Sequence, residues 1–558
     1  MDRVHRAAGA ADDRLNKTMT KRLCVSLSLL LIAVAVAVVT LRAQVSFDRV
    51  LNAAKEPHNW LSYSGTLDNQ RYSLLTQITP ANVKNLQLQW IWQSKSFEKY
   101  ETTPLVVDGV MYTVEAPNNV VALDAATGRP YWQFNYTPSP DGRPCCGRVN
   151  RGLAILGDTL YMGTVDAHLI AIDAKSGQQI WNTVVADAKE RYVITMAPNV
   201  IKDKVIIGTG GGDAPIRGYI AAFDAKTGKE LWRFYTIPGK GEPGNETWPG
   251  DSWKTGGVGV WNAGAYDPET NLVFYGTGNP QPDWDGSTRR GDNLYSDSVL
   301  ALDVDTGKLK WHYQFTPHDE LDYDSTQVPV LANIDWQGKP RKVMLWANRN
   351  GVMYVLDRTS GEFLKGKAYV KANWFDGFDA KGRPNRVKFP TAEGTIIQPH
   401  VHGATNWAPP SYSPRTGFFY VATWENSATM AVTGQFPRAA RPNGRETAMG
   451  ATTLSPYYNK DDEAYGVIRA YDAKTLDQKW EFKMTDITWG GVLSTASDLV
   501  FGGGREGYFL ALDGKTGALL WKGSVGGQIN AGAMSYAVNG KQYIAIAAGN
   551  SMFAYALP

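Results

Sequence analysis

The chain has 558 residues, and its 56 Gly, 19 Trp and 27 Tyr are the notable features of its composition. So many glycines and aromatic residues favour short strands joined by tight turns, in a chain long enough to bury a large core. The formal charge of +3 reflects 57 basic and 54 acidic residues, and this near balance argues against a nucleic-acid partner.

The N-terminal segment is typical of a secretory signal. Met19-Thr20-Lys21-Arg22 precedes an apolar run without charges, residues 23–41, and Arg42 and Ala43 follow it. A basic flank, an apolar stretch and a small residue before the cut define such a signal, so we expect cleavage after Ala43. Because the run is as long as a membrane span, an uncleaved anchor is the alternative. Residues 1–43 are thus interpreted as extension and signal, and residues 44–558 as one domain in the periplasm.

A hairpin motif recurs along the rest of the chain. Each copy has a strand ending in Asp, a turn that usually contains Thr-Gly or Ser-Gly, and a returning strand with Trp. Leu476 replaces the turn glycine in one copy, and residues 355–361 form a weaker copy. The full copies are Ala122–Trp132, Ala171–Trp181, Ala222–Trp232, Ala301–Trp311, Ala470–Trp480 and Ala511–Trp521. Unrelated hairpins in a sandwich would not repeat this offset six times, so the sequence predicts an all-β propeller.

Cys145 and Cys146 are adjacent, and the only other cysteine is Cys24. Neighbouring Cα atoms lie about 3.8 Å apart, closer than the roughly 4.4 to 6.8 Å of a relaxed disulfide, so a bridge between them would strain its peptide. Strain of this kind collects at functional sites, and an oxidising compartment would preserve the bond. The alternative is a pair of buried free thiols.

Oxygen-bearing side chains follow several of the predicted strands. Asp213 comes after a run of glycines, and Asn279 lies in Gly276-Thr277-Gly278-Asn279-Pro280. Asp322 and Asp324 alternate with apolar or aromatic neighbours, so both carboxylates face one side of an extended chain. Such oxygen ligands suit a hard cation such as calcium and do not suit zinc. A turn at Asp213 and a solvated acidic loop at 316–324 are the alternatives.

Several motifs occur together in a characteristic order. They are the blade motif, Cys-Cys-x-x-Val-Asn-Arg-Gly at 145–152, Gly-Thr-Gly-Asn-Pro at 276–280, Gly-Asp-Asn at 291–293, His-Asp-Glu-x-Asp-Tyr at 318–323 and Asn-Arg-Asn-Gly at 348–351. In these the chain resembles the dehydrogenases of methanol and ethanol that depend on pyrroloquinoline quinone (PQQ). The resemblance covers nearly all of residues 44–558. It implies an eight-bladed propeller with PQQ and a metal ion on its axis.

The resemblance also implies which side chains bind PQQ. The quinone would lie between the Cys145–Cys146 disulfide and Trp261. Further positions that match cofactor contacts are Glu101, Arg151, Thr195, Arg349, Asn406 and Trp489. PQQ is a flat tricarboxylate, for which an arginine fork and aromatic faces are suitable partners.

The same resemblance assigns the metal site and the chemistry. Its implied metal ligands are Asp213, Asn279, Asp322 and Asp324. Asp322 would take the proton of a primary alcohol while hydride passes to PQQ, and Arg349 would bind the quinone oxygens. The family usually has Glu where this chain has Asp213, but its lanthanide enzymes share an Asp at the place of Asp324. An added carboxylate favours a trivalent ion, so we expect a lanthanide ahead of calcium.

Other expectations concern the partners. The sequence has no Cys-x-x-Cys-His, the site of c-type haem attachment, so electrons are expected to pass to a separate soluble cytochrome c. A homodimer is one option for the subunit count. Leu321 replaces a usual Trp, and we expect this to reshape the substrate pocket. The rival function is a non-catalytic propeller scaffold of the cell envelope, although Cys24 lies in the wrong context for a lipid anchor.

Overall fold

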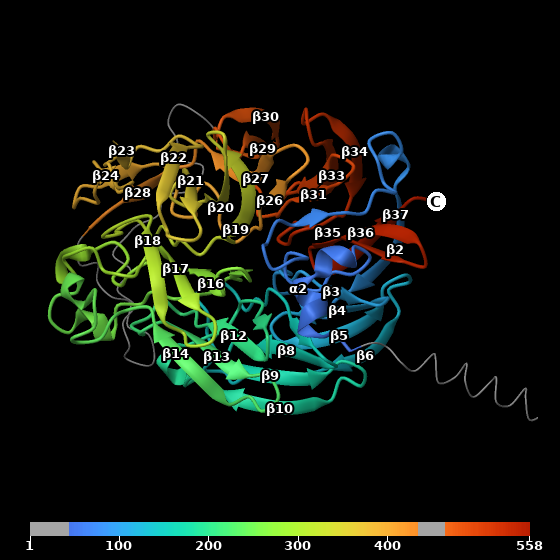
Figure 1. Ribbon diagram of the computed structural model, residues 1–558, viewed down its shortest axis with the longest axis horizontal. Helices are drawn as coiled ribbons and strands as arrows, with labels where there is room; N and C mark the ends of the chain where they lie inside the picture. The colour runs from blue at the N-terminus through green and yellow to red at the C-terminus, as the bar shows by residue number, and fades with distance from the viewer. Residues whose placement is uncertain (1–43, 434–463) are drawn as a thin grey trace, which may run out of the picture. The chain divides into compact units, whose positions relative to one another are not determined.

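The computed structural model describes residues 44–433 and 464–558, and the predicted signal lies outside these ranges. None of the helices in the described ranges has the length and apolar character that a membrane crossing requires. From Val45 onward the chain forms one compact unit. Its eight sheets of four or five strands succeed one another around a centre, which confirms the predicted all-β, eight-bladed propeller (Figure 1).

The first four blades each use four consecutive strands. Blade 1 has β3 (Leu105–Val107), β4 (Val110–Glu115), β5 (Asn119–Asp124) and β6 (Pro130–Phe134). Blade 2 has β7 (Ala154–Leu156), β8 (Thr159–Gly163), β9 (His168–Asp173) and β10 (Gln179–Val184). Blade 3 has β11 (Asn199–Ile201), β12 (Lys204–Gly208), β13 (Tyr219–Asp224) and β14 (Glu230–Tyr235). Blade 4 has β15 (Ala265–Asp267), β16 (Leu272–Gly276), β17 (Ser298–Asp303) and β18 (Leu309–Gln314).

The last four blades are less regular, and two of them include a strand from the beginning of the chain. Blade 5 has β19 (Val330–Trp336), β20 (Lys339–Ala347), β21 (Val352–Asp357) and β22 (Phe363–Ala368). Blade 6 has β26 (Ser411–Ser413), β27 (Phe418–Glu425), β29 (Tyr465–Asp472) and β30 (Gln478–Lys483). Blade 7 has β31 (Leu493–Thr495), β32 (Leu499–Gly503), β33 (Tyr508–Asp513) and β34 (Leu519–Ser524), with β1 (Tyr72–Ser73) beside β31. Blade 8 has β35 (Met534–Val538), β36 (Lys541–Ala548), β37 (Ser551–Ala556) and β2 (Gln87–Gln93).

The remaining elements are short. Two small sheets pair β23 (Phe375–Phe378) with β24 (Pro384–Arg386) and β25 (Thr395–Ile397) with β28 (Thr429–Ala431). The α-helix α2 spans Phe47–Leu51, with Ser46 as its N-cap. The short 3-10 helices are Ala53–Lys55, Val83–Asn85, Ala188–Glu190, Asn245–Thr247, Ser252–Lys254 and Gly286–Thr288.

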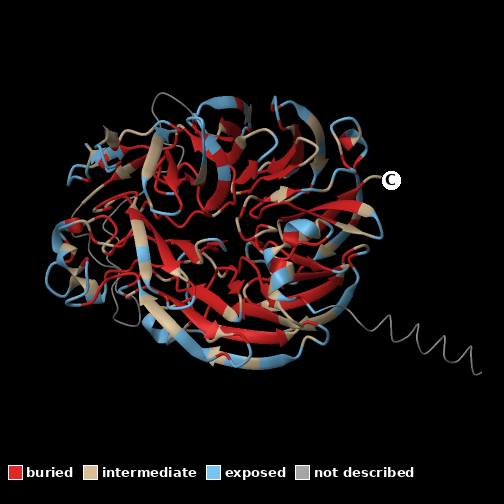
Figure 2. Ribbon diagram, viewed as in Figure 1, coloured by how far each residue is buried: buried red, intermediate tan, exposed pale blue. Residues whose placement is uncertain are grey.

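Burial changes from the inner to the outer strands of a blade. All six residues of β4 are buried, whereas β10 alternates between exposed and intermediate positions. Figure 2 shows the same gradient, with buried strands inside and exposed strands at the rim. Inner strands are covered on both faces by neighbouring blades, and they therefore carry almost continuous apolar sequence.

The repeated Trp and Gly meet between adjacent blades. Six tryptophans each pack on the turn glycine of the next blade, so closely that a Cβ on the glycine would lie within 2.8 Å of a ring atom. These glycines also have a positive φ, which side chains disfavour. The pairs are Trp90–Gly128, Trp132–Gly177, Trp181–Gly228, Trp232–Gly307, Trp311–Gly361 and Trp480–Gly517. The sequence motif is therefore a contact between blades.

Leu476, the exception in the repeat, is explained by its neighbour. In blade 5, Lys365 pairs with Val355 at the place where Trp311 pairs with Ala301 in blade 4. Blade 5 thus has no tryptophan at the position that covers the turn glycine in the other pairs of blades. Leu476 keeps the positive φ of that turn, at 58°, and its side chain is buried in an apolar cluster. Where the tryptophan is missing, the glycine is not required.

Two features close the ring. The first is β2, which pairs in antiparallel fashion with β37 and so joins an early strand to the last one. The second is an axial segment, residues 67–71, whose carbonyl groups accept hydrogen bonds from the innermost strands of four blades in succession. The donors are the backbone N–H groups of Tyr266, Leu331, Tyr412 and Ser494, in blades 4 to 7.

Arg71 extends the axial segment to the remaining blades. Its guanidinium is fully buried and donates to the carbonyl oxygens of Ala533 and Tyr63 and to Thr103 Oγ1, each at 3.0 Å. Ala533 precedes blade 8 and Thr103 precedes blade 1. Burial lowers the pKa of Arg71 to about 10, so it remains charged at neutral pH.

Candidate active site

Loops from most blades converge on a cavity of about 200 Å³. All the residues predicted for the cofactor, the metal ion and catalysis line it, although they are spread over nearly 400 positions of sequence. They are Glu101, Cys145, Cys146, Arg151, Thr195, Asp213, Trp261, Asn279, Asp322, Asp324, Arg349, Asn406 and Trp489. The structure thus brings the whole predicted set together.

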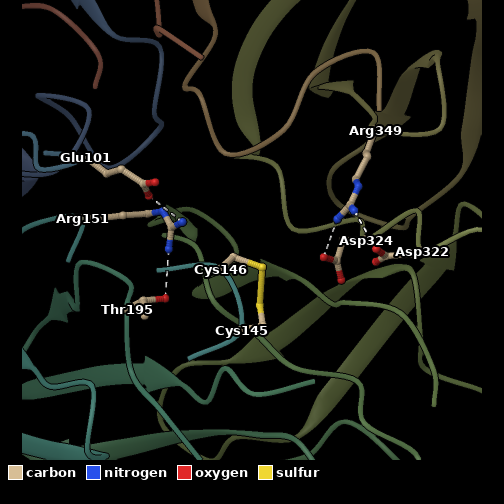
Figure 3. Close-up of a disulfide and its surroundings, with 8 residues drawn as sticks. All are labelled: Glu101, Cys145, Cys146, Arg151, Thr195, Asp322, Asp324 and Arg349. Carbon is tan, nitrogen blue, oxygen red and sulfur yellow. Dashed lines mark hydrogen bonds and ion pairs between the residues drawn. A yellow bond between two sulfur atoms is a disulfide. The ribbon is translucent and has the colours of Figure 1, made fainter. Parts of the chain in front are cut away.

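Cys145 and Cys146 form a disulfide, with their Cα atoms 3.8 Å apart. Both residues are exposed and line the cavity, so the alternative of two buried free thiols is wrong. Figure 3 shows the bridge with two charged clusters, one around Arg151 and one around Arg349.

The first cluster is built on Arg151. Its Nη2 lies 2.8 Å from Glu101 Oε2, and its Nη1 donates to Thr195 Oγ1 at 2.9 Å (Figure 3). The guanidinium carbon lies 4.8 Å from the centre of the Trp261 ring. Burial raises the pKa of Glu101, and the charge of Arg151 opposes this rise. Arg151 Nε is buried without a hydrogen-bond partner in the described residues, which leaves a donor for an anionic ligand.

The second cluster is built on Arg349. Its Nη1 lies 2.7 Å from Asp324 Oδ2 and its Nη2 lies 3.0 Å from Asp322 Oδ2 (Figure 3). Its Nε donates to the carbonyl oxygen of Val401 at 2.8 Å. Asp322 has a φ of 56°, an uncommon conformation for a residue with a side chain and one that occurs at functional sites. One guanidinium therefore fixes both carboxylates.

Asp213 and Asn279 complete an oxygen-rich wall beside this cluster. The backbone N–H of Asn279 donates to Asp324 Oδ1 at 2.8 Å. Gly278 allows this approach, because a Cβ there would lie 2.3 Å from the same oxygen. The structure therefore explains the glycine of the Gly-Thr-Gly-Asn motif.

Burial makes the ionised form of two carboxylates in this wall unfavourable. Burial raises the pKa of Asp213 to about 6, and the nearby charge of Asp324 adds to the effect. Burial also raises the pKa of Asp322 well above its usual value, against the opposing charge of Arg349. A cation would relieve both penalties. The donor set of carboxylate and amide oxygens fits a hard ion.

Three further residues of the site were not predicted from the sequence. His402, Trp407 and Lys99 also line the cavity, and the rings of Trp407 and Trp489 stack with centres 4.5 Å apart. Burial lowers the pKa of His402 to about 4, so its ring is neutral at neutral pH. Trp407 could have been predicted, because it directly follows Asn406, a predicted cofactor contact. His402 and Lys99 belong to none of the recognised motifs, so the sequence did not indicate a role for them.

The structure does not support the role predicted for Leu321. It was expected to reshape the substrate pocket, but its side chain is 1% exposed and lies in an apolar cluster with Trp284 and Trp374. It does not line the cavity.

Comparisons with known proteins support the same assignment. A family model described as the beta-propeller domain of glucose, ethanol and alcohol dehydrogenases with PQQ matches residues 60–366 and 482–544. The quinohemoprotein alcohol dehydrogenase ADH-IIG of Pseudomonas putida is 40% identical, over 95% of this chain and 77% of that protein. The chain belongs to the PQQ-dependent alcohol dehydrogenase family. It is thus an enzyme of this class, and the scaffold hypothesis is not supported.

This quinoprotein dehydrogenase is also similar to a second enzyme of Pseudomonas putida and to a solved methanol dehydrogenase structure. The quinoprotein alcohol dehydrogenase PedH of Pseudomonas putida is 37% identical, over 91% of this chain and 89% of that protein. A solved structure of a europium-containing methanol dehydrogenase superposes with a TM-score of 0.85 at 31% identity, covering 91% of this chain and all of that one.

Proposed function

We propose that this cavity binds PQQ together with a metal ion and oxidises a primary alcohol to the aldehyde. The observation that carries the proposal is the convergence of an arginine–carboxylate cluster, an aromatic wall and an oxygen-rich wall on one cavity. The bound cofactor would supply a quinone that accepts hydride. The protein supplies binding, orientation and proton transfer.

The Arg151 cluster is suited to the carboxylates of PQQ. Arg151 Nε and the Thr195 hydroxyl offer donors, and Glu101 holds the guanidinium in place. Trp261 and the disulfide would bound the flat ring, with Trp489 and Asn406 at its edge. Arg349 would donate to the quinone oxygens.

The metal ion would be held by Asp213, Asn279, Asp322 and Asp324. The second carboxylate, Asp324, adds negative charge and supports a lanthanide ahead of calcium. The solved methanol dehydrogenase with europium, similar over nearly the whole chain, also supports a trivalent ion. The shorter Asp213 leaves calcium as the second candidate.

Asp322 is proposed as the base. Its carboxylate faces the cavity, and burial raises its pKa, which makes it a stronger proton acceptor. The bond from Arg349 orients the carboxylate and favours its ionised form. Asp322 would thus take the hydroxyl proton of the alcohol as hydride leaves the neighbouring carbon.

The proposal also includes the location of the enzyme and its electron acceptor. Residues 1–43 would direct the chain to the periplasm, and residues 44–558 would form the catalytic domain. Electrons would leave to a separate soluble cytochrome c. An oxidising compartment agrees with the disulfide at the cavity.

Reconstitution tests this function. Purified protein loaded with PQQ and either calcium or a light lanthanide is assayed against a panel of primary alcohols with an artificial dye as electron acceptor. We expect dye reduction, with a higher rate in the presence of the lanthanide. Absence of activity with every alcohol and both ions would refute the proposal.

A further inference from the structure

Asp283 is a buried carboxylate that the proposed function does not use. It lies in the loop between β16 and β17, four residues after Asn279, and is 1% exposed. Its Oδ1 accepts hydrogen bonds from the side-chain amides of Asn279, at 2.5 Å, and Gln281. Its Oδ2 is buried and has no hydrogen-bond partner in the described part of the chain. Buried polar atoms are normally paired, so this oxygen requires an explanation.

In the part of the chain that the structure describes, no side chain is paired with the charge of this carboxylate. Asp283 forms no ion pair with the described residues. Arg289 is the cation whose charge acts on it, but its guanidinium donates to the carbonyl oxygens of Pro282 and Asp319. The other charges that act on Asp283 are the carboxylates of Asp213 and Asp324. A buried charge among like charges is costly, so the site lacks a positive charge that a bound cation would supply.

The bond to Asp283 fixes the side chain of Asn279. An ionised carboxylate can only accept hydrogen bonds, so the amide atom that faces Asp283 is the NH₂ group. The amide oxygen of Asn279 is consequently the atom directed away from Asp283. The backbone N–H of Asn279 is held as well, by Asp324 Oδ1 at 2.8 Å. Because Asn279 lines the cavity, this leaves its oxygen as the ligand for a hard cation.

Asp283 also changes the charge balance of the metal site. The carboxylates of Asp213, Asp322 and Asp324 against the guanidinium of Arg349 leave two negative charges. Asp283 adds a fourth buried carboxylate, and Arg289, the cation that acts on it, donates to carbonyl oxygens and forms no ion pair with it. Ligand charge is one of the properties by which an oxygen site selects its ion, and an additional carboxylate favours a trivalent ion.

We propose that Asp283 is a positioning residue of the metal site. It holds the amide oxygen of Asn279 toward the ion and adds the negative charge that favours a trivalent ion over a divalent one. The inference rests on the proposed function, because it needs an ion beside Asn279. It adds a residue that touches neither substrate nor PQQ.

Two variants separate the two effects. Asp283→Ala removes the hydrogen-bond acceptor and the charge, whereas Asp283→Asn keeps the shape and one acceptor oxygen without the charge. The control is Asp376→Asn, at an exposed position remote in sequence. The dissociation constants of Tb³⁺ and Ca²⁺ are measured by calorimetric titration of metal-stripped protein loaded with PQQ. Thermal unfolding without metal verifies that each variant is folded.

We expect Asp283→Ala to lower the affinity for both ions by roughly 10- to 100-fold, which is the usual effect of removing a hydrogen-bond partner of a metal ligand. Asp283→Asn should bind Ca²⁺ nearly as wild type does and lose about tenfold in Tb³⁺ affinity. Unchanged binding in Asp283→Ala overturns the positioning role, and an unchanged Tb³⁺/Ca²⁺ ratio in Asp283→Asn overturns the charge role. A wild-type protein that binds neither ion instead refutes the proposed metal site, and the inference with it.

Discussion

At the scale of single residues, the site depends on two arginines that each organise carboxylates. Arg349 contacts Asp322 and Asp324 through separate nitrogens, and Arg151 contacts Glu101 while its Nε remains available. A guanidinium group of this kind orients the carboxylate that it contacts and also stabilises its negative charge. The cavity is therefore organised before any ligand binds.

Asp322 provides a test of the proposed base. Asp322→Asn keeps the size of the side chain and an acceptor oxygen for Arg349, but the amide cannot take a proton. We expect kcat to fall by about 10²- to 10⁴-fold. PQQ binding, measured by retention of its absorbance after gel filtration, should persist. Asp376→Asn is the control, and a kcat close to wild type in Asp322→Asn would exclude the base role.

The disulfide provides a second test at this scale. Replacing Cys145 and Cys146 by Ser opens a bridge with no residue between its ends, so little unfolded-state entropy is released and stability should hardly change. Because the bridge forms part of the cavity wall, we expect turnover to fall by roughly 10- to 100-fold through misplaced cofactor. Turnover and the thermal midpoint are measured on the same preparation. A large loss of stability with intact turnover would contradict the assignment.

The sequence predicted much of the site because matching motifs place its residues at known points. Asp213, Asn279 and Asp322 each stand in a recognisable run. Asp283 does not, since an Asp that follows Pro282 is indistinguishable from a turn residue in the sequence. Its role becomes visible only when its two amide partners and its unpaired oxygen are known.

At the scale of the strands and turns, the propeller is held by contacts between blades. Six indole rings each cover a turn glycine of the next blade, and four of them donate their N–H to a carbonyl group near that turn, as from Trp232 to Val304 at 2.9 Å. The motif could be read from the sequence as a hairpin, but not as a contact. Trp90 escaped detection because it lies on β2, which is separated by hundreds of residues from its partner β37.

A comparison of two glycines distinguishes the cost of a positive φ from the cost of a clash with an indole ring. Gly307 and Gly338 have φ values of 69° and 80°, but a Cβ on Gly307 would lie 2.5 Å from the Trp232 ring, whereas one on Gly338 meets no atom within 4 Å. Both alanine variants carry the penalty for positive φ. We expect Gly307→Ala to lose about 1 to 3 kcal/mol more in free energy of unfolding, the usual range for overpacking.

Guanidinium denaturation measures this difference. In a background with Trp232→Ala, which removes the ring, the two glycine variants should differ little. If Gly307→Ala and Gly338→Ala lose the same stability in the wild-type background, the indole contact does not explain the glycine.

At the scale of the whole molecule, the axial segment joins blades that are far apart in sequence. Residues 67–71 bond to blades 4 to 7, and the side chain of Arg71 bonds beside blades 8 and 1. The repeat predicted a ring, but it contained no information about this segment, which lies outside the repeats. Its contacts are made mostly by backbone groups, and such contacts have no sequence signature.

Arg71 is the test at this scale. Arg71→Ala leaves three buried acceptors without their donor and creates a cavity, so we expect a loss of about 3 to 5 kcal/mol in free energy of unfolding. Arg290→Ala, at an exposed arginine, is the control. Equal denaturation midpoints for the two variants would show that the axial segment does not hold the blades together.

The pairing of β2 with β37 also determines when the molecule can become complete. The axial segment and β2 are synthesised first, yet their partners include Ala533 and the last strand, more than 450 residues later. Contacts of such long range slow folding, because the chain must close a very large loop before they form. Until the final blade emerges, β2 lacks its partner β37 and the side chain of Arg71 lacks the carbonyl group of Ala533, so blade 8 is the last to be completed.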